Sequence, residues 1–407
     1  MSPTDDQILV IGAGPAGLAA ASALLRAGLA VTVLERGPAV GSSWRTRHED
    51  LRLNTVRQFS GLPGMPIPRR FGRWVGRDDY ISYLEGVAVA EHIRVVTGVE
   101  ATRIERRDEV WAVLASDRVH RAEHVIVATG HDRIPVVPAW PGAADFAGEI
   151  RHVGSILAPR AYAGRDVLVA GGGNSGIEWA EHLARVGAGR IWLSVRTPPN
   201  LLPREVVGLP LHPLSVALRG LPIALKDANA RVVRRLTLGD LSRHGLPTPA
   251  EGPFRHIART GVTVAVDSGF SRLVRTGRVL VVPEIAAFEH DGARLVDGTV
   301  LAPSDVLAAT GYRSGLVDLV GDLGVLDERG RPRMAPDDVG RGLWFIGFTA
   351  AIEGMLRLHG IEARRIALAI GGARAGGWGP WRARSRGDSR AHVRALGGEE
   401  DMAQTAK

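Results

Sequence analysis

Two glycine-rich turns, each lying between an apolar run and a helix-like segment, constrain the fold of this chain most strongly. Gly12-Ala13-Gly14-Pro15-Ala16-Gly17 follows the apolar run 8–11. Gly171-Gly172-Gly173-Asn174-Ser175-Gly176 begins 159 residues after the first turn and follows the run 166–170. A strand, a G-x-G-x-x-G turn and a helix are the start of a dinucleotide-binding βαβ unit. The sequence therefore predicts an α/β protein with two Rossmann-like domains.

The first turn has the residues of an adenine-dinucleotide site. Gly12 permits the tight turn, Gly14 lets the backbone approach a pyrophosphate, and Gly17 allows close packing of helix on strand. Pro15 and Ala16 open the expected helix, whose N-terminus faces the phosphates. Glu35 stands 18 residues after Gly17, at the end of the next expected strand, where a carboxylate can accept hydrogen bonds from ribose hydroxyls. Arg36 is expected beside it in the same site.

The second turn differs in the residue that ends the following strand. Arg196 stands 20 residues after Gly176, where a guanidinium can bind a 2′-phosphate bidentately. This favours NADPH over NADH, the alternative being that Arg196 is one of many surface arginines. The two endings predict two different nucleotides, FAD in the first site and NADPH in the second. The turn residues expected to contact NADPH are Gly171, Gly173, Asn174, Ser175 and Gly176.

Two Thr-Gly pairs mark strand ends at which the backbone can turn beside a ligand. They are Thr129-Gly130 and Thr310-Gly311, the second followed by Tyr312. Three prolines after the first pair stiffen the exit into an inserted domain. The predicted organisation is an FAD-binding domain formed by residues 1–133 and 300–370, an inserted NADPH-binding domain at 134–299, and a disordered tail at 371–407.

Composition excludes several other classes of protein. The chain has no cysteine, which excludes a disulfide reductase with the same two-domain layout. Its net charge of +8 comes from arginines scattered along the chain, without a basic stripe or stacking aromatics, so no nucleic-acid partner is expected. Glycines and Pro15 would break a membrane span at 8–25, and a cytoplasmic protein is expected. The chain has no HExxH motif, and no metal is predicted.

Taken together, the motifs resemble those of class B flavin-dependent monooxygenases, most closely the YUCCA-type branch. The segment Phe146-Ala-Gly148-Glu-Ile-Arg-His152 fits the FxGxxxH part of the family fingerprint. Ile156 stands where the Baeyer–Villiger subgroup has an aromatic residue, which weakens assignment to that subgroup. The resemblance covers roughly residues 5–370, and its further matches are Trp44, 51–63, 174–178, 236–240, 309–312 and Gly347-Phe348.

The resemblance implies that NADPH reduces FAD, that O₂ adds at the flavin C4a position to form a C4a-peroxyflavin, and that one oxygen atom passes to a small organic substrate. N- or S-oxygenation and oxidative decarboxylation of an α-keto acid both stay open. The alternative is an NADPH-dependent flavin reductase or oxidase without oxygen insertion. The oligomeric state is open, with a homodimer among the alternatives.

The resemblance also suggests roles for residues outside the turns. Asn54 is the candidate catalytic residue, since its amide could donate to the peroxide, unless it only caps a turn. Trp44, Gly347 and Phe348 are expected near the flavin, although Trp44 could anchor a loop and Phe348 could belong to the core. His152 is expected at the domain junction rather than as a base. Residues 201–250 could line a substrate entrance or merely cover the NADPH domain.

Overall fold

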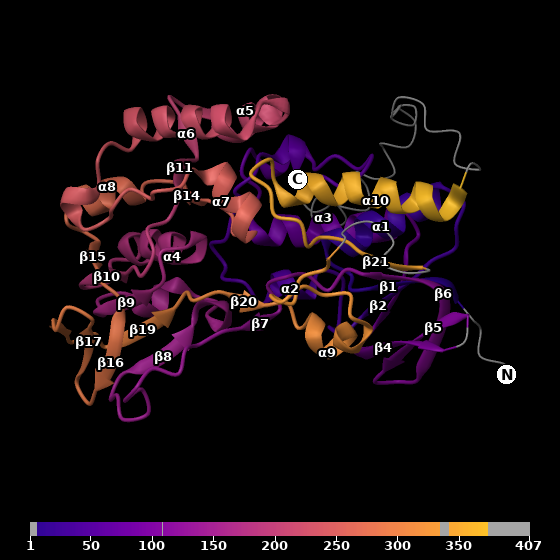
Figure 1. Cartoon of the computed structure of the whole chain (residues 1–407), viewed down its shortest axis with the longest axis horizontal. Coiled ribbons are helices and arrows are strands. Elements are labelled where there is room, and N and C mark those ends of the chain that lie inside the picture. The colour runs from indigo at the N-terminus through magenta and orange to yellow at the C-terminus, as the bar shows by residue number, and fades with distance from the viewer. Residues whose placement is uncertain (1–5, 108, 334–341, 373–407) are drawn as a thin grey trace, which may run out of the picture.

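Two parallel sheets, one in each half of the molecule, organise the chain (Figure 1). The computed structural model describes residues 6–107, 109–333 and 342–372. The predicted tail therefore lies, from residue 373 onward, outside the described residues. Within the described part, no helix combines the length and apolar character needed to cross a bilayer.

The first sheet has the strand order β3-β2-β1-β6 along its parallel part. Strand β6 is long, so its second half also pairs with β21 while its first half joins an antiparallel meander with β5 and β4. The bounds are β1 Asp6–Ile11, β2 Thr32–Glu35, β3 Arg94–Thr97, β4 Ala101–Arg107, β5 Val110–Ala115, β6 Val119–Val127 and β21 Leu343–Phe345.

Helices α1, α3 and α10 cover one face of this sheet, and α9 lies on the other beside β4 (Figure 1). Helix α1 is rich in alanine, which lets α10 pack close against it. The buried faces of α1, α3 and α10 and of strands β1 and β6 form the main apolar core, which packs the glycine-rich turn after β1 closely against the sheet. The bounds are α1 Pro15–Arg26, the short α2 Ser42–Arg45, α3 Arg77–Ala90, α9 Leu316–Val320 and α10 Met355–Gly371.

The second sheet repeats the same plan with the order β15-β10-β9-β19-β8, all parallel. Helices α4 and α8 pack on one face, and the antiparallel sheet β16-β17-β18 packs on the other. The bounds are β8 Glu149–His152, β9 Val167–Ala170, α4 Asn174–Arg185, β10 Ile191–Ser194, α8 Phe270–Arg275, β15 Leu280–Val282, β16 Ile285–Glu289, β17 Gly292–Leu295, β18 Val300–Leu301 and β19 Asp305–Ala308.

Strand β19 corrects one predicted boundary. The sequence prediction returned the chain to the first domain at residue 300, which placed this strand and Thr310 there. In the structure β19 pairs with β9, so it belongs to the second sheet. It holds the position there that β6 holds beside β1 in the first sheet. The crossing back to the first half therefore comes after Ala308.

The two chain crossings between the halves pair with each other. Strand β7 (Ile134–Pro135) leaves the first half, and β20 (Tyr312–Arg313) returns to it. They form a two-stranded antiparallel ribbon at the centre of the molecule (Figure 1). Arg47 from the first half donates to the Tyr312 hydroxyl at 2.5 Å and to the carbonyl of Asp132 at 3.2 Å. Both crossings are thus tied to one another and to the first half.

A helical cap is inserted between β10 and β15. Helices α5 and α6 lie along the top of Figure 1, above β11 and β14. A small apolar cluster around Leu202, Ala230 and Val264 joins the cap to Ile352 of the first half. The bounds are β11 Leu201–Pro203, β12 Glu205–Val206, β13 Leu209–Pro210, α5 Leu211–Ala217, α6 Ile223–Thr237, α7 Pro253–Thr260 and β14 Ala265–Asp267.

Candidate functional site

The two glycine-rich turns have nearly the same geometry. Gly12 has φ +108° and Gly171 has φ +119°, a region that side chains rarely adopt. A Cβ on Gly12 would lie 2.7 Å from the Ala128 carbonyl oxygen, and one on Gly171 would lie 2.5 Å from that of Ala309. Each turn is therefore pressed against the end of the neighbouring strand, β6 or β19, which leaves room for glycine alone.

The second and third glycines of each turn have different roles. A Cβ on Gly17 would lie 1.9 Å from the Gly12 carbonyl oxygen, and one on Gly176 would lie 1.8 Å from that of Gly171. These glycines allow helix and strand to pack closely. In contrast, a Cβ on Gly14 or Gly173 would meet no protein atom within 4 Å. Each lies immediately before the first residue of its helix, α1 or α4, so open space remains where a pyrophosphate would approach.

Glu35 ends β2 and is buried against the first turn. Its carboxylate accepts hydrogen bonds from the backbone N–H of Ala13 and of Gly37, both at 2.8 Å. The carboxylate thus lies at the edge of the turn and keeps lone pairs for hydroxyl donors. Pro15 and Ala16 begin α1 as expected. The geometry fits the predicted ribose contact, which stays a prediction.

The arginines at the two strand ends are exposed. Arg196 follows β10, its side chain is 78% exposed, and its nearest carboxylate is Glu284 at 3.7 Å. Such a weakly held guanidinium is available for a phosphate. Arg36 follows Glu35 and lies 3.8 Å from Glu100. Ser175 is exposed at the start of α4, whereas the Asn174 amide oxygen accepts the N–H of Val266 at 3.1 Å.

The Thr-Gly pairs lie at equivalent places in the two halves. Thr129 and Gly130 follow β6, and the Thr129 hydroxyl is buried without a hydrogen-bond partner. Thr310 and Gly311 follow β19, and the Thr310 hydroxyl donates to the Val136 carbonyl oxygen. The Thr129 hydroxyl is therefore free to hydrogen-bond a cofactor. The Thr310 hydroxyl instead fixes the segment just after β7, where the chain leaves the first half.

The remaining residues expected near the flavin have protein partners. Trp44 lies in α2 and packs edge-on against Tyr80, with ring centroids 4.6 Å apart. Gly347 follows β21, and its N–H donates to Glu362 of α10 at 3.0 Å. Phe348 packs against Phe345. Gly347 and Phe348 therefore connect β21 to the helix that covers α1, at the same sheet edge as the first turn.

His152 lies at the junction between the halves. Its Nδ1 accepts the N–H of Gly154 and its Nε2 donates to the Gly311 carbonyl oxygen, both at 3.0 Å. Its ring also packs edge-on against Tyr312. Burial lowers the pKa of His152, which favours this neutral tautomer. With both ring nitrogens engaged by backbone groups, His152 is suited to holding the crossing ribbon and not to moving protons.

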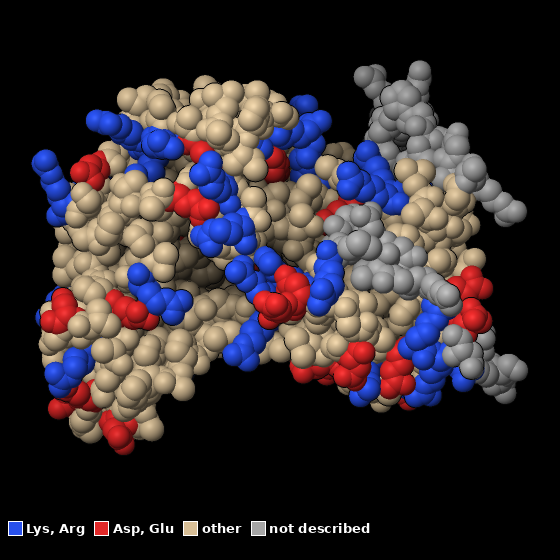
Figure 2. Space-filling model, in the orientation of Figure 1, with Lys and Arg blue, Asp and Glu red and all other residues tan. Residues whose placement is uncertain are grey.

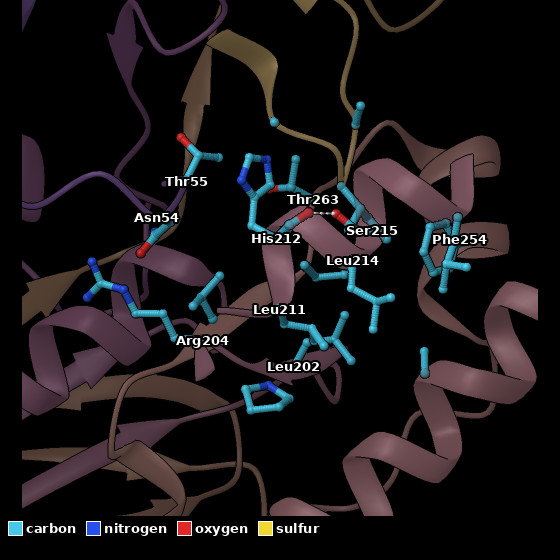
Figure 3. A pocket seen from close by; sticks show the side chains of 18 of the residues that line it. Asn54, Thr55, Leu202, Arg204, Leu211, His212, Leu214, Ser215, Phe254 and Thr263 are labelled. Atoms are coloured by element: carbon cyan, nitrogen blue, oxygen red, sulfur yellow. Dashed lines mark hydrogen bonds between the residues drawn. The ribbon is translucent and has the colours of Figure 1, made fainter. Parts of the chain in front are cut away.

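A cavity of about 310 Å³ lies where the cap meets both halves (Figure 3). Asn54 and Thr55 come from the first half, and Asn174 from the start of α4. This brings the candidate catalytic amide to the end of the second glycine-rich turn. The apolar part of the lining comes mainly from the cap and from the loop before α10, and includes Leu202, Leu211, Leu214, Leu218, Val233, Phe254, Val264, Ile352 and Leu356.

Arg204 is the residue of this cavity that the sequence analysis missed. Its guanidinium donates to the Leu53 carbonyl oxygen at 2.9 Å, next to Asn54, and stacks over the Trp74 ring with 3.9 Å to the centroid. Figure 3 shows it on the same side of the cavity as Asn54. Its Nε is buried without a partner, and within the described ranges no carboxylate lies within 4 Å of it. Burial lowers its pKa, yet an arginine stays protonated.

His212 fastens the cap over the cavity. Its Nδ1 accepts the N–H of Val56 at 3.4 Å, and its Nε2 donates to the Glu353 carbonyl oxygen at 2.8 Å. Burial lowers the pKa of His212, so the ring is neutral and can serve as both donor and acceptor. One side chain of α5 therefore holds two loops of the first half, and water is kept from that side of the cavity.

One group of possible metal ligands lies between the halves, away from this cavity. His48, Glu178 and His182 place three ligand-type atoms within 4.8 Å of one another. Glu178 and His182 are four residues apart on α4, a pairing that a search for histidine pairs does not find. Arg185 donates to Nδ1 of His182 at 3.1 Å, which leaves the hydrogen on Nε2, the atom that faces Glu178. In this arrangement Nε2 carries the hydrogen and lies 3.6 Å from the Glu178 carboxylate without a hydrogen bond to it, so it has no lone pair for a metal.

Comparison with known proteins agrees with this architecture. Residues 9–201 match the family model described as pyridine nucleotide-disulphide oxidoreductase. Indole-3-pyruvate monooxygenase YUCCA1 of Oryza sativa subsp. japonica is 35% identical over 350 residues, covering 84% of this chain and 86% of the relative. The probable indole-3-pyruvate monooxygenase YUCCA4 of Arabidopsis thaliana is 32% identical over 349 residues and covers 84% of each chain.

The fold is also found among solved structures. The flavin-containing monooxygenase of Stenotrophomonas maltophilia superposes with a TM-score of 0.68 at 23% identity, covering 90% of this chain and all of that one (100%). The paired glycine turns, the lack of cysteine and the identity to the YUCCA relatives agree with one another. The chain thus belongs to the class B flavin-dependent monooxygenases, near the YUCCA branch, and is an oxidoreductase that uses FAD, NADPH and O₂ to oxygenate a small molecule.

Proposed function

We propose that this monooxygenase acts on a 2-oxo acid with an apolar, aromatic-sized side chain and decarboxylates it oxidatively. The overall change would be 2-oxo acid, O₂, NADPH and a proton giving the carboxylic acid one carbon shorter, CO₂, water and NADP⁺. The relatives named as indole-3-pyruvate monooxygenases act on such an acid by their names. Bound flavin, once reduced, would supply the oxygen-activating chemistry.

The observation that carries the proposal is the half-buried guanidinium of Arg204, which forms no salt bridge with a described residue. A cation that is partly removed from water and has no salt-bridge partner favours the approach of an anion. A carboxylate can accept two parallel hydrogen bonds from a guanidinium, which fixes its position as well as neutralising it. The part of the cavity formed by the cap leucines is apolar, so the acid would place its carboxylate at Arg204 and its side chain against those leucines.

The other residues of the cavity would then orient and shield the substrate. Leu53 accepts from Arg204, so the anchored carboxylate would lie near the adjacent Asn54, whose amide can donate to a developing oxyanion. His212 keeps the cap closed through the two backbone hydrogen bonds described above. The assignment of FAD to the first turn and NADPH to the second, the cytoplasmic location and the homodimer stay predictions of the sequence.

The test compares two cations of the same cavity. Arg204→Met should lower kcat/KM for indole-3-pyruvate or phenylpyruvate about a hundredfold, because charge-assisted hydrogen bonds to the carboxylate are lost. Oxidation of a thioether without a carboxylate should change only a few-fold. Lys226→Met is the matched control, since Lys226 also lines the cavity but rests on the Phe254 ring and the Arg219 carbonyl oxygen.

The products decide between the proposal and the alternatives. One CO₂ released per NADPH consumed is expected with the 2-oxo acid. Hydrogen peroxide formed in equal amount to NADPH, with no CO₂, would identify an NADPH oxidase. Efficient thioether oxidation with no turnover of the acid would identify an S-oxygenase and refute the role of Arg204.

A further inference from the structure

The outer side of the helical cap carries an unusual number of exposed apolar side chains. Seven large hydrophobic residues between 207 and 236 are more than 40% exposed, the extremes being Val207 at 97%, Leu236 at 80% and Leu209 at 71%. We call this surface the cap face. Its members are Val207, Leu209, Leu214, Ile223, Leu225, Val232 and Leu236.

The exposed apolar residues of helix α6 lie on one face of the helix. Leu225, Val232 and Leu236 are spaced by seven and four residues, so they line one side of the helix. Asp227 and Ala230, which are buried, lie on the opposite side. Helix α6 therefore presents an apolar stripe to solvent, a pattern that marks a surface able to meet another apolar phase.

The hairpin between β12 and β13 adds an apolar tip to the same segment. Val207 adopts φ +50°, a conformation that is costly for a β-branched residue, and its side chain is almost wholly exposed. The positive φ belongs to the two-residue turn of the hairpin, since Gly208 has φ +73° as well. The exposed Val207 side chain would gain apolar contact by insertion into an apolar medium.

The charges of the segment are almost all positive. Residues 206–237 contain five cations and one carboxylate, Asp227, which is buried and accepts N–H groups at the start of α7. Figure 2 shows the surface over α5 and α6 as largely uncharged, with Lys and Arg side chains on either side of it. The five cations are Arg219, Lys226, Arg231, Arg234 and Arg235. Three of them, Arg219, Arg231 and Arg235, are exposed and available to a partner, whereas Lys226 lines the cavity and Arg234 is half-buried.

This charge distribution favours one of two possible partners for the cap face. Two copies of the chain meeting through their cap faces about a twofold axis would bring like cations together. An anionic bilayer instead offers phosphate groups to the cations and acyl chains to the leucines, in the way that amphipathic helices lie in a membrane surface.

The cavity described above opens toward this surface. Leu214 and Asn229 line the cavity and are also exposed, and they lie on α5 and α6. We propose that the cap face docks on the surface of an anionic lipid membrane, with Val207, Leu225 and Leu236 entering the interface.

The experiment uses flavin-loaded full-length enzyme and vesicle flotation. Vesicles of phosphatidylcholine with phosphatidylglycerol should carry the enzyme, and vesicles of phosphatidylcholine alone should carry much less. The double variant Leu225→Asp/Leu236→Asp should bind the anionic vesicles at least about tenfold more weakly, because two buried apolar contacts are replaced by charges. Val296→Asp is the matched control, since Val296 is 62% exposed but lies in the second half, after β17.

Flavin content and NADPH oxidation in solution should be unchanged in these variants, which shows that they are folded. Equal binding by the double variant and the wild type, abolished by salt, would mean simple adsorption of a basic protein and would overturn the proposal. A dimer in size-exclusion chromatography that the double variant converts to a monomer would overturn it in favour of a second copy. Failure to bind any vesicle would overturn it as well.

Discussion

Two neighbouring glycines of the second turn should respond in opposite ways to the same substitution. In Gly176→Ala the new Cβ would lie 1.8 Å from the Gly171 carbonyl oxygen, where ordinary contact begins at 3.4 Å. In Gly173→Ala it would point into open space, from a backbone with φ −75° and ψ −174° that alanine adopts freely. The first change therefore perturbs the fold, and the second perturbs only what binds there.

The magnitudes follow from these geometries. Relief of the Gly176 clash needs helix α4 to move away from the strand by about 1.6 Å, and overpacking of this kind costs roughly 1–3 kcal/mol or more. Gly173→Ala should instead change the free energy of unfolding by less than about 1 kcal/mol, because the entropy that alanine removes from the unfolded chain is offset by its poorer fit at the N-cap of α4. The same methyl group would occupy space needed by the pyrophosphate, so NADP⁺ binding should weaken about tenfold or more.

The assay combines urea unfolding with calorimetric titration of NADP⁺, and flavin content serves as the control for the first site. Gly173→Ala should keep nearly the wild-type stability and bind NADP⁺ more weakly, and Gly176→Ala should be clearly less stable than the wild type. If Gly173→Ala bound NADP⁺ as tightly as wild type, no phosphate would lie against that glycine. If Gly176→Ala unfolded at the wild-type urea concentration, the close packing of α4 on β9 would not be as described.

Two further predictions concern charge. Arg196→Ala should raise the KM for NADPH at least about tenfold and leave the KM for NADH nearly unchanged, because only NADPH has a 2′-phosphate for this guanidinium to bind. The Arg196 side chain is exposed and its carboxylate neighbour is 3.7 Å away, so it is available for that contact. Equal effects on both nucleotides would exclude a contact with the 2′-phosphate. Burial, the largest effect, lowers the pKa of His48 from 6.5 to about 4, so the unfolded chain binds a proton at higher pH than the folded one. The free energy of unfolding should therefore fall as the pH drops from 6.5 toward 4, by up to about 3 kcal/mol for this residue. In urea unfolding between pH 7 and 4, His48→Gln should lose less stability than the wild type.

The nucleotide-binding frame could be predicted from sequence because its determinants are local. A glycine with positive φ, a helix that starts at the next turn and an acid or arginine at a strand end all lie within about 25 residues of one another. The clashes that a Cβ would cause at Gly12, Gly17, Gly171 and Gly176 show why these positions are glycine.

The boundary at residue 300 was wrong for an instructive reason. Ala128-Thr129-Gly130 and Ala309-Thr310-Gly311 look alike because each follows the strand next to its own glycine-rich turn. The repeated motif marks the same position in two sheets and not two passes through one sheet. Strand pairing, which local sequence does not specify, was needed to tell these apart.

The cavity could not be predicted because its residues come from distant segments. Asn54, Arg204 and Ile352 meet only after both sheets and the cap have assembled. The importance of Arg204 rests on an absence, since no described carboxylate pairs with it, and a chain with so many arginines gives no sign of which one is left unpaired. The apolar composition of 201–250 did indicate a covering or lining segment, and the structure shows that its inner side lines the cavity.

The paired crossings β7 and β20 restrict how the two halves can move. Two independent linkers would let the halves slide and twist in several directions, whereas hydrogen bonds between the strands couple the linkers so that neither moves alone. Reorientation of the second half would therefore have to bend this ribbon beside Arg47 and Tyr312 and also part the cap from the loops held by His212 and Arg204. A substitution in the ribbon would then change the separation of the two glycine-rich turns while leaving the residues of both turns intact.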